Sequence, residues 1–180
     1  MGPDLPLAGP LSVPRPTGRG ATGLLESSAM KTFKTLAELA ACVGQDVAVS
    51  DWIGIEQSRI DRFAEATGDH QWIHTDPVRA KAGPFGTTIA HGFLTLSLLP
   101  WFLENAVSIE EARMGVNYGL NRVRFTSPVP VGSRLRGHLH LLGAEAVEGD
   151  GWQFTWRLTV ELEGAGRPAC VAESIARLYP

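Results

Sequence analysis

One apolar segment, residues 89–103, decides how this chain folds, and it reads IAHGFLTLSLLPWFL. Its apolar side chains would cover nearly all sides of a helix, which is typical of a helix buried all round. At fifteen residues, with His91, Gly92 and Pro100 inside it, the segment is too short and too polar to span a bilayer. We therefore predict a central buried helix that kinks or ends near Pro100, and no membrane insertion.

Downstream of this helix the apolar pattern changes from helical to alternating, as in half-buried strands. A phase slip near Asn121 predicts a bulge, and a polar, glycine-containing stretch at 143–151 is interpreted as a loop. We expect one antiparallel sheet of about five strands with the buried helix against it, an α+β fold. The expected strands cover residues 47–53, 116–125, 135–141, 152–162 and 169–178.

Length and composition indicate one globular domain over residues 30–180, because 44% of the chain is hydrophobic. Residues 1–29 are rich in proline and glycine, and we interpret them as a disordered N-terminal extension or as non-native leader sequence. A net charge of −3 without a basic run argues against nucleic-acid binding. Cys42 and Cys170 have neither metal-site nor disulfide spacing, which favours a reducing, cytoplasmic setting.

Helices are also expected ahead of the apolar segment. One should begin at Ser58, which is placed as an N-cap, and end at Gly68, which suits a left-handed C-terminal position. Asp76 followed by Pro77 predicts the start of a further helix. His74 would then lie in an irregular loop between two helices.

The strongest acid/base candidates lie around this loop and at the start of the apolar segment. A loop can turn Asp69 and His74 towards one water, and a carboxylate with an imidazole makes a usable general acid/base pair. His91 and Gly92 open the central helix, where free N–H groups could polarise a carbonyl and glycine allows a close approach. The plainer alternative is that Asp69 caps the next helix, His74 is a partly buried polar residue, and His91-Gly92 only begins a helix.

Metal and nucleotide sites have weaker support. His70 and His74 are four residues apart, but a glycine before them and a proline after them argue against one continuous helix that carries both. His138 and His140 share a strand face with arginines, which favours a solvated or interface face over a metal site. Neither a phosphate-binding loop nor a dinucleotide-binding glycine pattern occurs in the sequence. We therefore predict no metal and no cofactor.

Two stretches together resemble the motif of a known family. Residues 66–77 read ATGDHQWIHTDP, and Gly92 follows His74 by 18 residues within the sequence IAHGF. In order and spacing, this combination of Asp, His and Gly is similar to the MaoC-like family of (R)-specific enoyl-CoA hydratases, whose motif is roughly G-D-x-N-P-h-H with h apolar. The resemblance extends over residues 30–180.

The resemblance implies a hot-dog fold, in which the sheet wraps the central helix, and a homodimer that binds an acyl-CoA thioester. It implies that Asp69 and His74 orient a catalytic water and move its proton, while the Gly92 N–H polarises the thioester carbonyl. Water would add to C3 of a trans-2-enoyl-CoA to give an (R)-3-hydroxyacyl-CoA in fatty-acid metabolism. Gln71-Trp72 stands where Asn-Pro is usual, and the bulk of Trp72 is expected to reshape the acyl tunnel.

Two other functions stay open at this point. Hot-dog proteins also hydrolyse thioesters, so the chain could be an acyl-CoA thioesterase. It could also be a non-catalytic acyl-CoA-binding dimer, although the Asp69 and His74 pair argues against that. Loss of the enoyl double bond, release of a free thiol, or binding without turnover distinguishes the three.

Overall fold

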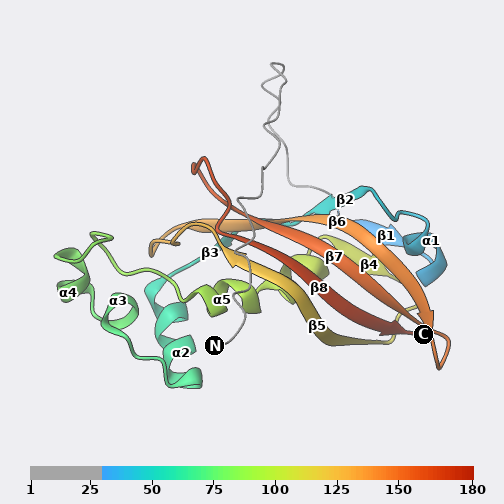
Figure 1. Ribbon diagram of the computed structural model, residues 1–180, viewed down its shortest axis with the longest axis horizontal. Helices are drawn as coiled ribbons and strands as arrows, with labels where there is room; N and C mark the ends of the chain where they lie inside the picture. The colour runs from blue at the N-terminus through green and yellow to red at the C-terminus, as the bar shows by residue number, and fades with distance from the viewer. Residues whose placement is uncertain (1–29) are drawn as a thin grey trace, which may run out of the picture.

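A curved antiparallel sheet forms most of the computed structural model, which describes residues 30–180 (Figure 1). The strand order is β2-β6-β7-β8-β5, and β3 also pairs with β6. These strands are β2 (Asp46–Val49), β3 (Ile53–Gly54), β5 (Met114–Phe125), β6 (Arg134–Val147), β7 (Gly151–Leu162) and β8 (Cys170–Tyr179). A separate parallel pair joins β1 (Lys31–Phe33) to β4 (Val107–Ile109). The expected extension, residues 1–29, lies outside the described residues.

The helices are short and fall into three places. α5 (Gly92–Ser97) and α6 (Leu99–Glu104) lie under the sheet, and α1 (Leu36–Ala40) lies near β1 (Figure 1). Beyond one end of the sheet lie α2 (Gln57–Thr67), α3 (Trp72–Thr75) and α4 (Pro77–Lys81). A sheet that wraps a central helix is the hot-dog arrangement, so the predicted fold class is confirmed. None of the helices within residues 30–180 has the length and hydropathy needed to cross a bilayer.

The core lies between the central helix and the inner face of the sheet. On β7 the predicted alternation holds, and Phe154, Leu158 and Val160 are completely buried. Burying side chains of this size contributes about 1.5–3 kcal/mol each. Phe102 of α6 is also completely buried, and a Cβ added to Gly137 of β6 would lie 2.7 Å from the Phe102 Cβ. Glycine at 137 therefore allows the helix to pack directly on the strand.

The central helix is broken in its middle. The Leu98 N–H bonds to the carbonyl of Thr95, three residues back, and Pro100 occupies the first turn of α6. Proline lacks an N–H, so residue 100 cannot donate to the carbonyl of Leu96 four residues back, and the interruption falls near Pro100 as the sequence predicts. A single chain does not bury this helix on all sides, because Phe93 is 68% exposed. The sheet covers one side of α5, and Phe93 instead packs edge-on against Phe125 of β5.

β5 is the last strand of the sheet and pairs with β8 along its length. Its register shifts between Leu120 and Arg122, which confirms the predicted bulge, and again between Asn117 and Gly119. The strand carries several large apolar side chains that are exposed to solvent. These are Met114, Val116, Tyr118, Leu120 and Phe125.

Several element boundaries differ from the predicted ones. α2 begins after Glu56 in place of Ser58, which is already helical. The stretch predicted as a loop at 143–151 is largely strand, because a register shift between Leu141 and Gly143 lets β6 continue past the glycine. The predicted strand at 47–53 is two short strands, β2 and β3, that both pair with β6.

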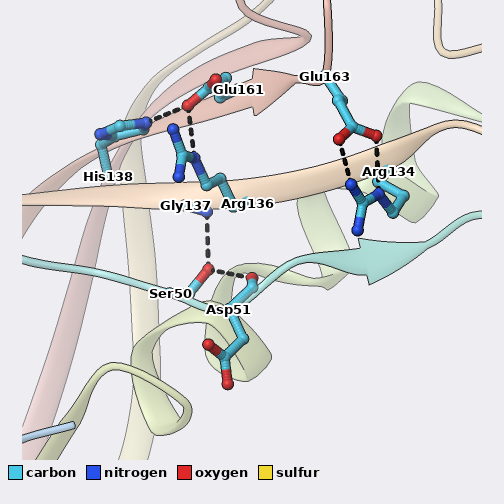
Figure 2. A network of polar contacts seen from close by, with 8 residues as sticks. All are labelled: Ser50, Asp51, Arg134, Arg136, Gly137, His138, Glu161 and Glu163. Carbon is cyan, nitrogen blue, oxygen red and sulfur yellow. Dashed lines mark hydrogen bonds and ion pairs between the residues drawn. The ribbon is translucent and has the colours of Figure 1, made fainter. Parts of the chain in front are cut away.

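The face of β6 and β7 that points away from the core carries a cluster of ion pairs (Figure 2). Arg136 and His138 on β6 both bond to Glu161 on β7, at 2.7 and 2.6 Å, and Arg134 pairs with Glu163 in the same way. Burial opposes ionisation of Glu161, but the two hydrogen bonds outweigh it and hold the pKa of this carboxyl below its ordinary value. The charged partners on this face account for the polar positions of β6 and β7.

Candidate active site

Asp69 is delivered to the site by the end of α2. Gly68 caps that helix in the left-handed conformation, at φ 75°, and its N–H bonds to the Ala64 carbonyl. The chain therefore turns sharply, and Asp69 begins the segment that leads to α3. The Asp69 carboxylate is exposed and accepts one long hydrogen bond, 3.4 Å, from the Gln71 N–H. The capping role considered for Asp69 belongs to Asp76, whose side chain accepts from the Arg79 N–H at the start of α4.

His74 is held rigidly, because it lies in the short helix α3 and not in the predicted irregular loop. Its side chain is only 6% exposed, and Nδ1 lies 2.7 Å from the Ile89 carbonyl oxygen. A carbonyl can only accept, so Nδ1 carries the proton and Nε2 keeps a lone pair. Burial is the largest effect on the pKa of His74 and lowers it. The hydrogen bond to the Ile89 carbonyl opposes this, and the smaller effects of His91, which lowers the pKa, and Asp69, which raises it, leave the net shift downward. The imidazole is therefore held in the neutral form that can accept a proton.

The His91 ring stacks against one face of the His74 ring. The residue is 3% exposed, and the two ring centroids lie 3.8 Å apart with an interplanar angle of 26°. Its Nε2 donates to the main-chain carbonyl of Asp69 at 2.9 Å. The ring of Phe63 on α2 also packs against the His91 ring, with centroids 5.0 Å apart. His91 thus contacts both members of the predicted acid/base pair.

Gly92 is the first residue of α5, where main-chain N–H groups have no acceptor within the helix. A Cβ at this position would lie 2.8 Å from the Phe125 ring, so glycine is required for the close approach of β5. Gly92 and His74 line one cavity of about 270 Å³ together with Thr95 and Phe125. The geometry therefore brings a hydrogen-bond donor and a neutral imidazole to the same cavity.

Gln57 supports the site from the first turn of α2. Its amide nitrogen donates to the His74 carbonyl at 2.8 Å and to Asp61, and its amide oxygen accepts from the buried Thr88 hydroxyl at 2.6 Å. These bonds join three segments that lie far apart in the sequence. Neither Gln57 nor Thr88 was predicted as a site residue, because their types are common and nothing in their spacing marks them.

Asp69, His74 and His91 are residue types that can bind a metal ion, and they lie close together. One nitrogen of each histidine and one carboxylate oxygen lie within 4.8 Å of one another. However, the two rings stack almost parallel, so their in-plane lone pairs run side by side and do not converge on one ion about 2 Å away. Hydrogen bonding is less demanding than coordination, so the cluster suits a small polar molecule such as water.

The other singled-out residues lie away from this cluster. The His70 side chain is half exposed and 3.9 Å from Glu65. Trp72 lies under the Arg79 guanidinium and against Gly83, where an added Cβ would be 2.9 Å from its ring, so it joins α3 to α4. It is not among the residues lining the cavity beside His74. The tryptophan therefore stiffens the segment that carries His74.

Comparison with known proteins identifies relatives of this chain. Residues 38–160 match the MaoC-like domain family. A Mycobacterium tuberculosis protein named 3-hydroxyacyl-thioester dehydratase Z is 55% identical over 148 residues, which cover 82% of this chain and 98% of that protein. Nodulation protein N of Rhizobium leguminosarum is 48% identical over 143 residues, covering 78% and 89%.

Solved structures give the same fold at lower sequence identity. The (R)-hydratase of A. caviae involved in PHA biosynthesis aligns with TM-score 0.58 and 22% identity over 77% of this chain and 96% of that one. The MaoC-like dehydratase of Rhodospirillum rubrum aligns with TM-score 0.65 and 20% identity, covering 81% and 96%. The chain therefore belongs to the MaoC-like family of hydratases and dehydratases and has its hot-dog fold.

Proposed function

We propose that this protein is an (R)-specific enoyl-CoA hydratase that adds water reversibly to trans-2-enoyl-CoA and forms an (R)-3-hydroxyacyl-CoA. The observation that carries the proposal is the neutral, fixed imidazole of His74 beside both the Asp69 carboxylate and the cavity at Gly92. The relative that is 55% identical is named for dehydration of 3-hydroxyacyl thioesters, which is the same reaction in reverse.

In the proposed mechanism, Asp69 accepts a hydrogen bond from a water, and the Nε2 lone pair of His74 accepts its other proton. The water oxygen then bonds to C3 while the C2–C3 π electrons move towards the thioester carbonyl. The Gly92 N–H donates to the carbonyl oxygen, which holds the developing enolate charge. The proton taken by His74 returns to C2, so the elements of water are added and no other reactant is needed.

The acyl chain is proposed to run along the central helix away from Gly92. A second cavity of about 370 Å³ is lined by the same helix, where Leu96 follows Thr95 of the first cavity in the sequence. Leu96, Leu99 and Leu103 form its apolar wall on the helices, and residues of β5 close the other side. Apolar side chains along this path favour an alkyl chain as the part of the substrate that they bind.

A homodimer is proposed to form through the open edge of β5. The exposed apolar side chains on this strand would be buried there, and a second copy of β5 could satisfy the free main-chain groups of the edge. Static light scattering should give twice the mass of one chain, 19.4 kDa. A cytoplasmic location also stays a prediction, in keeping with the free thiols of Cys42 and Cys170.

The proposed activity is tested with crotonyl-CoA, because hydration removes the absorbance of the conjugated double bond. We expect Asp69→Asn and His74→Gln each to lower kcat by about 10²- to 10⁴-fold. His70→Gln, a matched change in the exposed neighbour, should keep full activity. Full activity in both Asp69→Asn and His74→Gln would reject these roles, and free thiol release in place of hydration would show a thioesterase. Binding of the CoA ester without turnover would show a non-catalytic protein.

A further inference from the structure

The resemblance of the sequence motif implies roles for Asp69, His74 and Gly92, and it leaves the role of His91 open. We propose that His91 is a positioning residue of the proposed hydratase reaction, which fixes Asp69 through a hydrogen bond and His74 through a ring contact. The inference rests on the proposed function and adds a residue that acts through two others.

The first connection is to Asp69. The side chain of this residue is exposed and, among the described residues, accepts one hydrogen bond, of 3.4 Å, from the Gln71 N–H, which leaves the carboxylate able to meet a water. The His91 Nε2–H reaches the Asp69 main-chain carbonyl at 2.9 Å from a buried ring. This shorter bond ties the start of the Asp69 segment to the start of α5, although the residues are 22 positions apart.

The second connection is to His74. With Nδ1 bonded to Ile89, the His74 ring could still tilt about that bond, and the stacked His91 ring at 3.8 Å blocks the tilt on one face. Phe63 in turn holds the His91 ring from α2, at 5.0 Å. The orientation of the His74 Nε2 lone pair therefore depends on the presence of a flat ring at position 91.

A structural requirement of α5 does not account for this histidine. His91 occupies the N-cap position but makes no side-chain cap bond. Within the described residues, its Nδ1 is the one buried side-chain nitrogen or oxygen that lacks a hydrogen-bond partner. An unpaired buried polar atom is unfavourable for stability, so an apolar residue would serve the helix at least as well. The contacts with Asp69 and His74 are what this side chain provides.

The experiment compares three variants with the wild-type protein in the crotonyl-CoA assay, with thermal unfolding measured for each. His91→Leu removes both the donor and the ring, and His91→Gln restores an amide donor that can reach the Asp69 carbonyl. His70→Leu is the control, because the side chain of this neighbouring histidine is half exposed and its ion-pair partner is Glu65. Activity is measured as kcat and KM separately.

We expect His91→Leu to lower kcat by about 100-fold, as a misplacement of reacting groups by about 1 Å does, with KM changed less than about threefold. His91→Gln should recover at least about tenfold of that loss, and His70→Leu should match the wild type. The unfolding temperature of His91→Leu should stay within about 3 °C of the wild-type value, because the lost hydrogen bond is offset by removal of the unpaired nitrogen.

When the wild-type protein is an active hydratase, three results overturn the inference. One is an unchanged kcat in His91→Leu, and another is an equal loss in the Leu and Gln variants, which removes the role of the hydrogen bond. The third is a fall in kcat that follows a fall of more than about 10 °C in unfolding temperature, which marks a purely structural residue. A wild-type protein without hydratase activity rejects the proposed function and the inference together, whereas a fully active His91→Leu variant of an active wild type rejects the inference alone.

Discussion

The two halves of this molecule are built in different ways. In the sheet and the helix against it, apolar side chains such as Phe154 and Phe102 are buried without any specific polar partner. In the end formed by α2, α3 and the start of α5, two buried histidines are fixed by individual hydrogen bonds to main-chain carbonyls. The sheet and its helix are therefore stabilised mainly by the apolar surface that they bury. The site end instead has its geometry fixed by a few hydrogen bonds. Changes in one half should act on unfolding, and changes in the other on turnover.

The largest expected effect belongs to the core. Phe102→Ala should lower the free energy of unfolding by about 3–5 kcal/mol, because the ring is completely buried against β6 and the cavity is not refilled. Urea denaturation measures the loss. Val78→Ala on α4, where the side chain is 86% exposed, is the control and should stay within about 0.5 kcal/mol. An equal effect of the two substitutions would contradict the assignment of the core.

A second substitution tests whether a residue at the site end affects both the stability and the turnover of the protein. Gln57→Leu leaves the buried Thr88 hydroxyl and the His74 carbonyl without their partner, so it should cost about 1–3 kcal/mol of unfolding free energy. Because α3 is then less restrained, kcat with crotonyl-CoA should also fall. Arg62→Leu on the same helix is the control, since its guanidinium bonds only to Ser58. A stability loss without a fall in kcat would show that Gln57 is structural alone.

The pH dependence sharpens the description of the site. Since the pKa of His74 is lowered in the folded protein, the folded state binds fewer protons than the unfolded chain just below pH 6.5. This residue's contribution to stability is therefore complete above about pH 6.5 and is lost as the pH falls through the lower, folded-state pKa.

The same titration should limit catalysis, because a protonated His74 cannot accept the proton of water. Plots of kcat/KM against pH should stay level down to about pH 6.5 and fall below it. The His74→Gln variant, if measurable activity remains, should lose this acidic limb. A wild-type midpoint above pH 6.5 would contradict the neutral, buried imidazole.

The smallest expected effect is a difference in reactivity between the two cysteine thiols, one of which lies in the sheet. Burial raises the pKa of the Cys170 thiol to about 11, so this side chain on β8 should resist alkylation at pH 8 in the folded protein. Cys42 is partly exposed and should react first. Mass spectrometry after timed labelling separates the two sites, and labelling in urea is the control in which both react. Rapid modification of native Cys170 would show that β8 opens readily.

The sequence predicts the sheet and its helix better than it predicts the contacts at the site end. The alternation on β7 and the bulge near Asn121 are local patterns, and both are confirmed because each strand position is set by its own neighbours. Local chemistry also predicted the left-handed conformation of Gly68 and the helix start at Asp76-Pro77, and both are confirmed. The continuation of β6 beyond Gly143 was missed because a register shift depends on the partner strand.

At the candidate site, the sequence suggests Asp69, His74 and Gly92 but not the residues that hold them in place. The order and spacing of Asp69, His74 and Gly92 suggested a shared site. In the structure Asp69 lies near His74 and His91, and His74 lines a cavity with Gly92. The stack of His91 on His74 and the bonds of Gln57 connect positions 17 to 31 residues apart. No helical or strand periodicity encodes such contacts, so only the folded chain reveals them.

One consequence follows from the position of Phe125. Its ring lies under Gly92, where it leaves no room for a side chain, and the same residue ends the strand whose outer edge is open. If two copies of the chain pair along that edge, dissociation would free the strand whose Phe125 ring packs against Gly92. Specific activity would then decrease as the protein is diluted, and assays at nanomolar enzyme would underestimate the turnover of the intact assembly.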